Sequence, residues 1–181
     1  MQLTGSIALL LMSGLLLWSS RPGRSWSGAG SARFAAALIM LVQAVLSLVP
    51  LDMPYSLRLL PQQLSLYAAL PLLITTLITA AFGFHWSRLI WGRLLLALCV
   101  VFEIARRINE LHTWLLIALG VAFVAAVLHL KSDKKNSPLA IVSWALLFVW
   151  YYQTGLAQND LNLWLAATIV PSLYLHRAGT R

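Results

Sequence analysis

Seven apolar segments alternate with short polar connections along the chain. By residue number they are 3–18, 34–49, 64–82, 88–110, 113–130, 138–153 and 161–175. Apolar runs that approach the ~20 residues needed to cross a bilayer predict one membrane-spanning helix each. The pattern therefore predicts an all-α integral membrane protein, a bundle of seven transmembrane helices, with six helices as the alternative.

In the fourth segment, charged residues lie closer to the middle than in the other apolar segments. Nine uncharged residues, Leu94 to Phe102, separate Arg93 from Glu103. Nine residues of α-helix rise only about 13 Å, whereas the hydrocarbon core is about 30 Å thick. If this segment spans the membrane, at least one of the two charges lies below the headgroups. Snorkelling of the side chain toward the nearer surface explains Arg93 without a function.

The connection between the second and third segments differs from the others. Residues 51–63 include Pro54 and Pro61, two charged residues and several leucines. This mixture is typical of a short segment lying at the membrane surface, so we expect an interfacial loop segment here and not a span. The Pro61–Gln62 pair is accordingly expected in a loop.

Proline also interrupts the third segment. Pro71 lies inside this apolar run, where its ring removes one helical hydrogen bond and usually kinks the helix. Thr75, Thr76 and Thr79 follow within the next turns. Their hydroxyl groups are expected to satisfy the carbonyls that the proline frees.

Composition supports the membrane interpretation. The chain has 181 residues, of which 60% are apolar and 10% are charged, whereas a soluble domain is about 25% charged. This shortage of charge excludes an ordinary soluble fold and a disordered chain, and predicts one polytopic transmembrane domain over residues 1–181. The single cysteine, Cys99, lies in an apolar run and has no second cysteine for an intrachain disulfide.

Orientation in the membrane explains the net charge of +8 better than nucleic-acid binding does, because the basic residues lie in short connections. With seven spans, one side holds one of the five acids and ten of the thirteen cations: Arg21, Arg24, Arg33, Arg88, Arg93, Lys131, Lys134, Lys135, Arg177 and Arg181. The positive-inside rule places this side in the cytoplasm. We therefore expect the N-terminus outside and the C-terminus in the cytoplasm, in a bacterial inner membrane. With six spans, loss of one span after the first connection would move every later connection to the opposite side, and the ten-to-three distribution of cations would be lost.

Tryptophan positions agree with the expected span ends, because tryptophan is enriched at both membrane–water interfaces. Five tryptophans fall near predicted boundaries and are expected in an aromatic belt: Trp18, Trp86, Trp114, Trp150 and Trp164. Trp144 lies well inside the sixth segment, and we expect its ring to pack between helices.

Glu103 is the centre of the predicted binding site, since ionisable residues inside a membrane often mark function. On a helix it shares a broad face with Arg107 and Glu110, and Arg106 lies beside that face. Other polar residues of the predicted outer half are expected to join it: Gln43, Ser47, His112, Tyr152, Gln153 and Asn162. The alternative is that Glu103–Arg107 and Arg106–Glu110 form i,i+4 pairs that only end the span.

Three histidines form the candidate metal site. His85, His129 and His176 fall at predicted cytoplasmic helix ends, and imidazole binds zinc or, as an axial pair, haem iron. No metal-binding spacing connects them, and the sequence has no G-x-S-x-G, H-E-x-x-H or P-loop motif. We therefore expect no catalytic residue and no cofactor, and the sequence favours a protein that is not an enzyme.

Three functions are consistent with these patterns. The first is a small membrane subunit or accessory protein that acts through helix–helix contacts. The second is a transporter or channel-like protein with an outward-facing polar site around Glu103. The third is a membrane enzyme or redox protein that uses the cytoplasmic histidines. The expected partners are the lipid bilayer and either another membrane protein or a second copy of this chain, with no nucleic acid.

Overall fold

The described part of the chain is entirely helical. The computed structural model describes residues 2–21, 27–49, 55–82, 86–108, 110–129, 137–154 and 161–178, and within these ranges it contains no strand. Seven continuous helices run through them. They are α1 (Gln2–Ser19), α2 (Gly28–Leu48), the joined α3 (Tyr55–Leu64), η1 (Ser65–Ala69) and α4 (Leu70–Ala81), α5 (Arg88–Arg107), α6 (Leu111–His129), α7 (Ser137–Thr154) and α8 (Leu161–Ala178).

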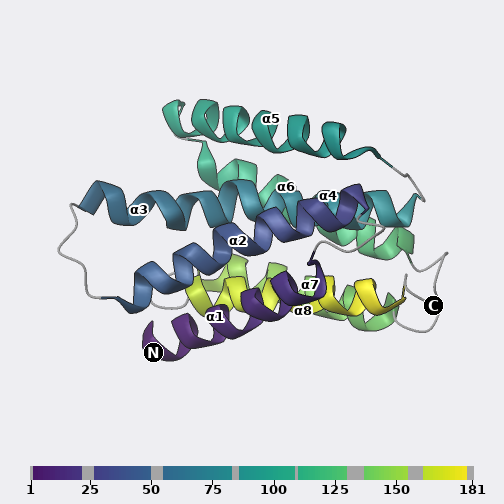
Figure 1. Ribbon diagram of the computed structural model, residues 1–181, viewed down its shortest axis with the longest axis horizontal. Coiled ribbons are helices and arrows are strands. Elements are labelled where there is room, and N and C mark those ends of the chain that lie inside the picture. Colours follow the sequence, from purple (N-terminus) through teal and green to yellow (C-terminus); the bar gives the residue numbers. More distant parts are fainter. Residues whose placement is uncertain are drawn as a thin grey trace.

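Successive helices run back and forth along the long axis of the molecule (Figure 1). α2 packs against α1, α4 and α5, while α8 packs against α1 and α7, and α6 joins α4 to α7. α5 lies at the outside of the bundle (Figure 1) and contacts α2, η1, α4 and α6. We call the end of the bundle where α5 finishes the Glu103 end, and the opposite end, where α5 begins, the Arg93 end.

Apolar side chains fill the interior and also cover much of the exterior. The largest fully buried side chains come from all parts of the bundle, among them Leu9, Met40, Leu73, Leu119 and Trp164. Large apolar side chains are exposed along α1, α2, α5, α6 and α7. An apolar exterior around an apolar core is what a helix bundle has when its surroundings are hydrocarbon and not water.

Three helical stretches of the described chain are long and apolar enough to cross a membrane: Gly28–Leu48, Leu59–Thr79 and Leu111–Leu128. The shorter apolar helical stretches are Leu3–Ser19, Ile141–Gln153 and Leu161–Leu173. α5 belongs to neither group, because its arginines and Glu103 interrupt its apolar run. These lengths and compositions support a membrane protein.

The second helix begins earlier than the apolar pattern predicted. α2 starts at Gly28, six residues before the expected position 34. Ser27 is its N-cap, and the Ser27 hydroxyl accepts a hydrogen bond from the backbone N–H of Gly30 at 3.1 Å. This bond satisfies one of the free N–H groups at the helix start, so small residues that look like a loop form the first turns.

The expected loop before the third segment is helical where the structure describes it. Residues 51–54 lie outside the described ranges, but α3 begins at Tyr55 and contains Pro61. The helix continues through Pro61, and we attribute this to the contacts of α3 with α2 and η1, which outweigh the lost hydrogen bond. That this segment lies at the membrane interface stays a prediction.

Pro71 is preceded by a π-helical segment, η1, in which the N–H of Leu70 donates to the carbonyl of Ser65. In a regular α-helix the ring of Pro71 would clash with the carbonyl of Tyr67, and the wider π-turn contains that carbonyl. The threonine hydroxyls donate to carbonyls after the proline, for example Thr75 to Leu72 at 2.8 Å. The expectation that they satisfy carbonyls freed by Pro71 is therefore wrong.

Two tryptophans test the expected belt. Trp144 is 1% exposed and packs in the core, which confirms its predicted position between helices. Trp164 is completely buried, and its indole Nε1 donates to the carbonyl of Leu147 at 3.1 Å. Its assignment to the interfacial belt is wrong, because the Trp164 ring packs against α7 inside the bundle and does not reach the bundle surface.

Candidate functional site

The polar side chains predicted to meet near Glu103 lie at one end of the bundle but form three separate groups. This end contains the last turns of α2, α5 and α7 and the first turns of α1, α6 and α8. The helices therefore bring the expected residues to one level. The rotation of each helix about its own axis then decides which of these side chains meet.

The first group belongs to α5 alone. The Glu103 carboxylate accepts hydrogen bonds from Arg106 Nε and Nη2, both at 3.0 Å, and from Arg107 Nε at 3.1 Å. The side chains of Glu103 and Arg107 are 38% and 78% exposed. Exposed pairs of this kind are screened by solvent and contribute little to stability. The carboxylate is thus neutralised by its own helix and faces the outside of the bundle.

One of the two expected i,i+4 pairs is present and the other is not. Glu103 pairs with Arg107 as expected, but Arg106 pairs with Glu103 and not with Glu110. α5 ends at Arg107, so the helical spacing that would align Arg106 with Glu110 is lost. The Glu110 carboxylate instead accepts a hydrogen bond from the Thr113 hydroxyl at 2.6 Å.

The second group connects three helices. Gln43 Nε2 on α2 donates to Asn162 Oδ1 on α8 at 3.3 Å. Asn162 Nδ2 donates to the hydroxyls of Ser6 on α1 at 2.8 Å and of Ser47 on α2 at 3.2 Å. Gln43 is only 6% exposed and Ser6 only 2%. Among the described polar groups at this end, this Asn162 network joins the most helices, namely α1, α2 and α8.

A glycine allows α1 and α8 to approach closely beside the Asn162 network. A Cβ atom added to Gly5 would lie 3.0 Å from the backbone nitrogen of Leu163 and 3.4 Å from Asn162 Cβ. Interhelical hydrogen bonds next to a small residue are typical of packed transmembrane helices. Gln43, Ser47 and Asn162 are predicted from the sequence, but Ser6 is not, because its only signal is its place beside Gly5 in an apolar run.

The third group joins α6 to α7. The Tyr151 hydroxyl and His112 Nδ1 share a hydrogen bond of 2.6 Å, and the two rings stack with centroids 5.5 Å apart. Tyr151 is buried against Trp164, whereas the neighbouring Tyr152 and Gln153 are exposed. His112 therefore meets Tyr151, which the sequence analysis did not select. The buried spacing of Trp144, Leu147 and Tyr151 was the signal that pointed to it.

The three histidines proposed as metal ligands fall outside what the structure describes. His85 is outside the described ranges, and His129 and His176 lie near the ends of α6 and α8 with side chains that are not described. Among the described side chains, no group of three histidine, cysteine or acidic residues is close enough to hold a metal ion.

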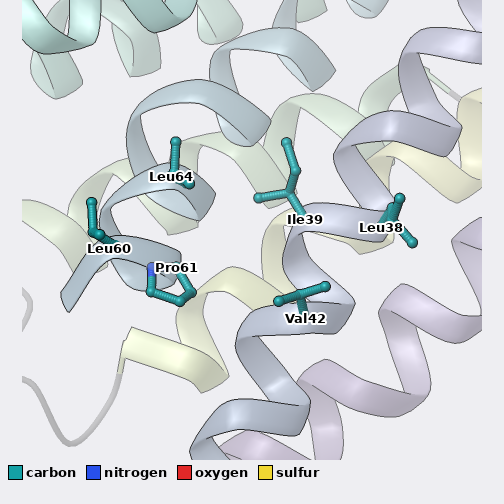
Figure 2. Close-up of a pocket in the computed structure, with 6 residues that line it drawn as sticks. All are labelled: Leu38, Ile39, Val42, Leu60, Pro61 and Leu64. Carbon is teal, nitrogen blue, oxygen red and sulfur yellow. The ribbon is translucent and has the colours of Figure 1, made fainter. Parts of the chain in front are cut away.

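An apolar groove lies between α2 and α3. Its volume is about 360 Å³, and its lining comes from both helices: Leu38, Ile39, Val42, Leu60, Pro61 and Leu64. Figure 2 shows Ile39 and Val42 of α2 opposite Leu64 and Pro61 of α3, with Leu38 and Leu60 farther from the centre of the groove. The groove has no polar side chain in its lining, so it suits an apolar occupant. Leu60 and Pro61 belong to the segment expected to be a loop, so the sequence did not predict this groove.

No family model, curated protein or solved structure matches this chain.

Proposed function

We propose that this chain is a multi-pass protein of a bacterial inner membrane that crosses the bilayer seven times, with its N-terminus outside and its C-terminus in the cytoplasm. The back-and-forth course of the helices supports an odd number of crossings, since α1 begins at the Glu103 end and α8 runs to the Arg93 end (Figure 1). The assigned charges support the orientation. The cytoplasmic side has ten cations and one acid, giving +9, and the other side has three cations and four acids, giving −1.

Reporter fusions at the two ends of the full chain test this topology. A reporter active only in the cytoplasm should work at the C-terminus and fail at the N-terminus. Two active fusions, or two inactive ones, would place both ends in one compartment and support six spans instead. A further fusion in the connection at 131–136, which seven spans place in the cytoplasm, distinguishes which span is missing.

We propose that the protein acts as a subunit or accessory protein through helix–helix contacts. One observation carries this proposal: the polar side chains of Glu103, Asn162 and His112 each bind a partner within the chain and do not share a cavity, whereas large apolar side chains are exposed along α1, α2, α5, α6 and α7. Asn162 binds three side chains within the bundle, and Glu103 binds two on its own helix. A transport site around Glu103 would need these groups to converge on one cavity, and they lie in three separate places.

The apolar groove between α2 and α3 is the proposed contact surface for a partner helix. A transmembrane helix gains little from hydrophobicity alone in lipid, so shape determines where it packs. A groove lined by Val42, Leu60 and Leu64 receives the side chains of a second helix in the manner of ridges into grooves. The partner we propose is accordingly an apolar transmembrane helix of another membrane protein.

Purification of the full chain in mild detergent tests the proposal. Val42→Trp fills the groove, and Val121→Trp adds the same bulk to α6 outside it; the two valines are 44% and 42% exposed, so they form a matched pair. We expect a partner to remain with the parent chain and with Val121→Trp and to be lost from Val42→Trp. A chain that always purifies alone, or two variants with equal retention, would contradict the proposal.

A further inference from the structure

Arg93 differs from the other arginines whose side chains the structure describes. Arg93 is exposed on α5 and has no ion pair or hydrogen bond to another described residue. The others each have a partner: Arg21 lies 4.6 Å from the centre of the Trp18 ring, Arg33 Nε donates to the Ala29 carbonyl at 3.3 Å, and Arg106 and Arg107 pair with Glu103. Arg93 thus carries a full charge with no described protein group to compensate it.

The position of Arg93 along α5 places its charge below the end of the helix. It lies five residues after Arg88, where α5 begins, and five residues rise about 7.5 Å. An arginine side chain covers a similar length and reaches the headgroup level by snorkelling. Under the proposed topology the guanidinium therefore ends at the cytoplasmic phosphate layer while its stem lies beside the acyl chains.

Below Arg93 the same face of α5 is apolar and open. Leu96 and Val100 are 68% and 58% exposed, and Ile104 continues the face one turn further. Residues three, seven and eleven positions after Arg93 lie on one side of a helix. A Cβ atom added to Gly92, which lies beside Arg93, would meet no atom within 4 Å, so the face is not covered by the rest of the described protein.

We propose that Arg93 binds the phosphate of an anionic phospholipid, one acyl chain of which lies along Leu96, Val100 and Ile104. The planar guanidinium forms paired hydrogen bonds with phosphate oxygens. A net negative headgroup also complements the +9 charge assigned to this side. A second copy of the chain fits less well, because a symmetric parallel dimer through this face would bring two Arg93 side chains to the same depth.

This inference rests on the proposed membrane orientation but not on the proposed partner helix. The site is on α5, whereas the groove is between α2 and α3, so the two proposals fail separately. Loss of a co-purifying protein reports on the groove, and the lipids retained by the chain report on Arg93.

Native mass spectrometry of the full chain tests the site, after exchange into detergent containing equal amounts of phosphatidylglycerol and phosphatidylcholine with the same acyl chains. We expect the parent chain to retain phosphatidylglycerol preferentially. Arg93→Gln should reduce the preference about fivefold, the ratio expected for one cation near a membrane surface. Arg93→Lys should keep most of it. Arg107→Gln is the matched control, an exposed arginine at the other end of α5, and should leave the preference unchanged.

Three results would overturn the proposal. Equal retention of the two lipids by the parent chain removes the headgroup selectivity. An unchanged preference in Arg93→Gln assigns it to other cations of the same side. Displacement of the lipid by millimolar glycerol phosphate shows a free-phosphate site and no role for the apolar face. If Arg93→Gln does not fold, a salt titration of the parent chain replaces it, and a preference unchanged between low and high salt contradicts a site built on an exposed charge.

Discussion

Replacing Gly28 by alanine is expected to destabilise the contact between the first turns of α2 and α5. A Cβ atom added to Gly28 would overlap the backbone carbonyl oxygen of Trp86 and lie 2.5 Å from Trp91 Cδ1 and 2.8 Å from Trp91 Nε1. Trp91 is 3% exposed and its ring packs against Trp86 with centroids 5.5 Å apart. Neither the carbonyl nor the buried indole can move without disturbing the start of α5.

The size of this effect follows from the cost of overpacking. Extra atoms forced into a filled site typically cost 1–3 kcal/mol, so we expect a loss of about that size. For a chain of this length each kcal/mol corresponds to about 2–4 °C in Tm. The Gly28→Ala variant should therefore unfold about 2–12 °C below the parent chain in the same detergent.

Two other glycines provide the controls. A Cβ atom added to Gly14 on α1 or to Gly120 on α6 would meet no atom within 4 Å. Alanine at these helical positions should be neutral or stabilise by up to about 1 kcal/mol, because it restricts the unfolded chain more than glycine does. Thermal unfolding followed by circular dichroism compares the three variants. A Tm of Gly28→Ala equal to or above those of the two controls would refute the close contact between α2 and α5.

Three further substitutions test the polar groups at the Glu103 end by the same thermal measurement. Asn162→Ala removes the side chain that connects α1, α2 and α8, and should cost about 1–2 kcal/mol at about 0.6 kcal/mol per interhelical bond; an unchanged Tm would contradict the network. Tyr151→Phe should lower Tm because it breaks the part-buried hydrogen bond to His112, whereas Tyr152→Phe on the exposed side should not; equal effects would contradict the inward orientation of Tyr151 and the outward orientation of Tyr152. Glu103→Gln should leave Tm nearly unchanged, because solvent screens the exposed pairs that Glu103 forms; a clear loss of stability would show that its carboxylate has a structural role.

The sequence predicts where the helices lie better than it predicts how they are rotated. Apolar run length locates α1, α7 and α8 to within a few residues, because the backbone in each run must satisfy its own hydrogen bonds. It also places Trp144 inside the bundle. α2 and α3 are extended into regions that look like loops, since a serine cap and contacts with a neighbouring helix are not visible in the average hydropathy.

The groups at the Glu103 end show why the site was predicted only in part. Charge and polarity assigned Gln43, His112 and Asn162 to one level of the bundle, which the helix directions reproduce. Ser6 and Asn162 are 156 positions apart, so their contact depends on which helices are neighbours. Tyr151 and Tyr152 differ by one position, or about 100° around the helix, and only packing against Trp164 decides which of them faces inward.

The π-helical segment η1 sets how far α3 is rotated relative to α4 about their common helix axis. Its wide turn between Ser65 and Ala69 accommodates a residue that a regular α-helix of the same course would omit. Deleting one residue there would rotate everything upstream by about 100° relative to α4. Leu60 and Leu64 would then swing away from α2 and the groove would vanish, although every side chain that lines it would still be present.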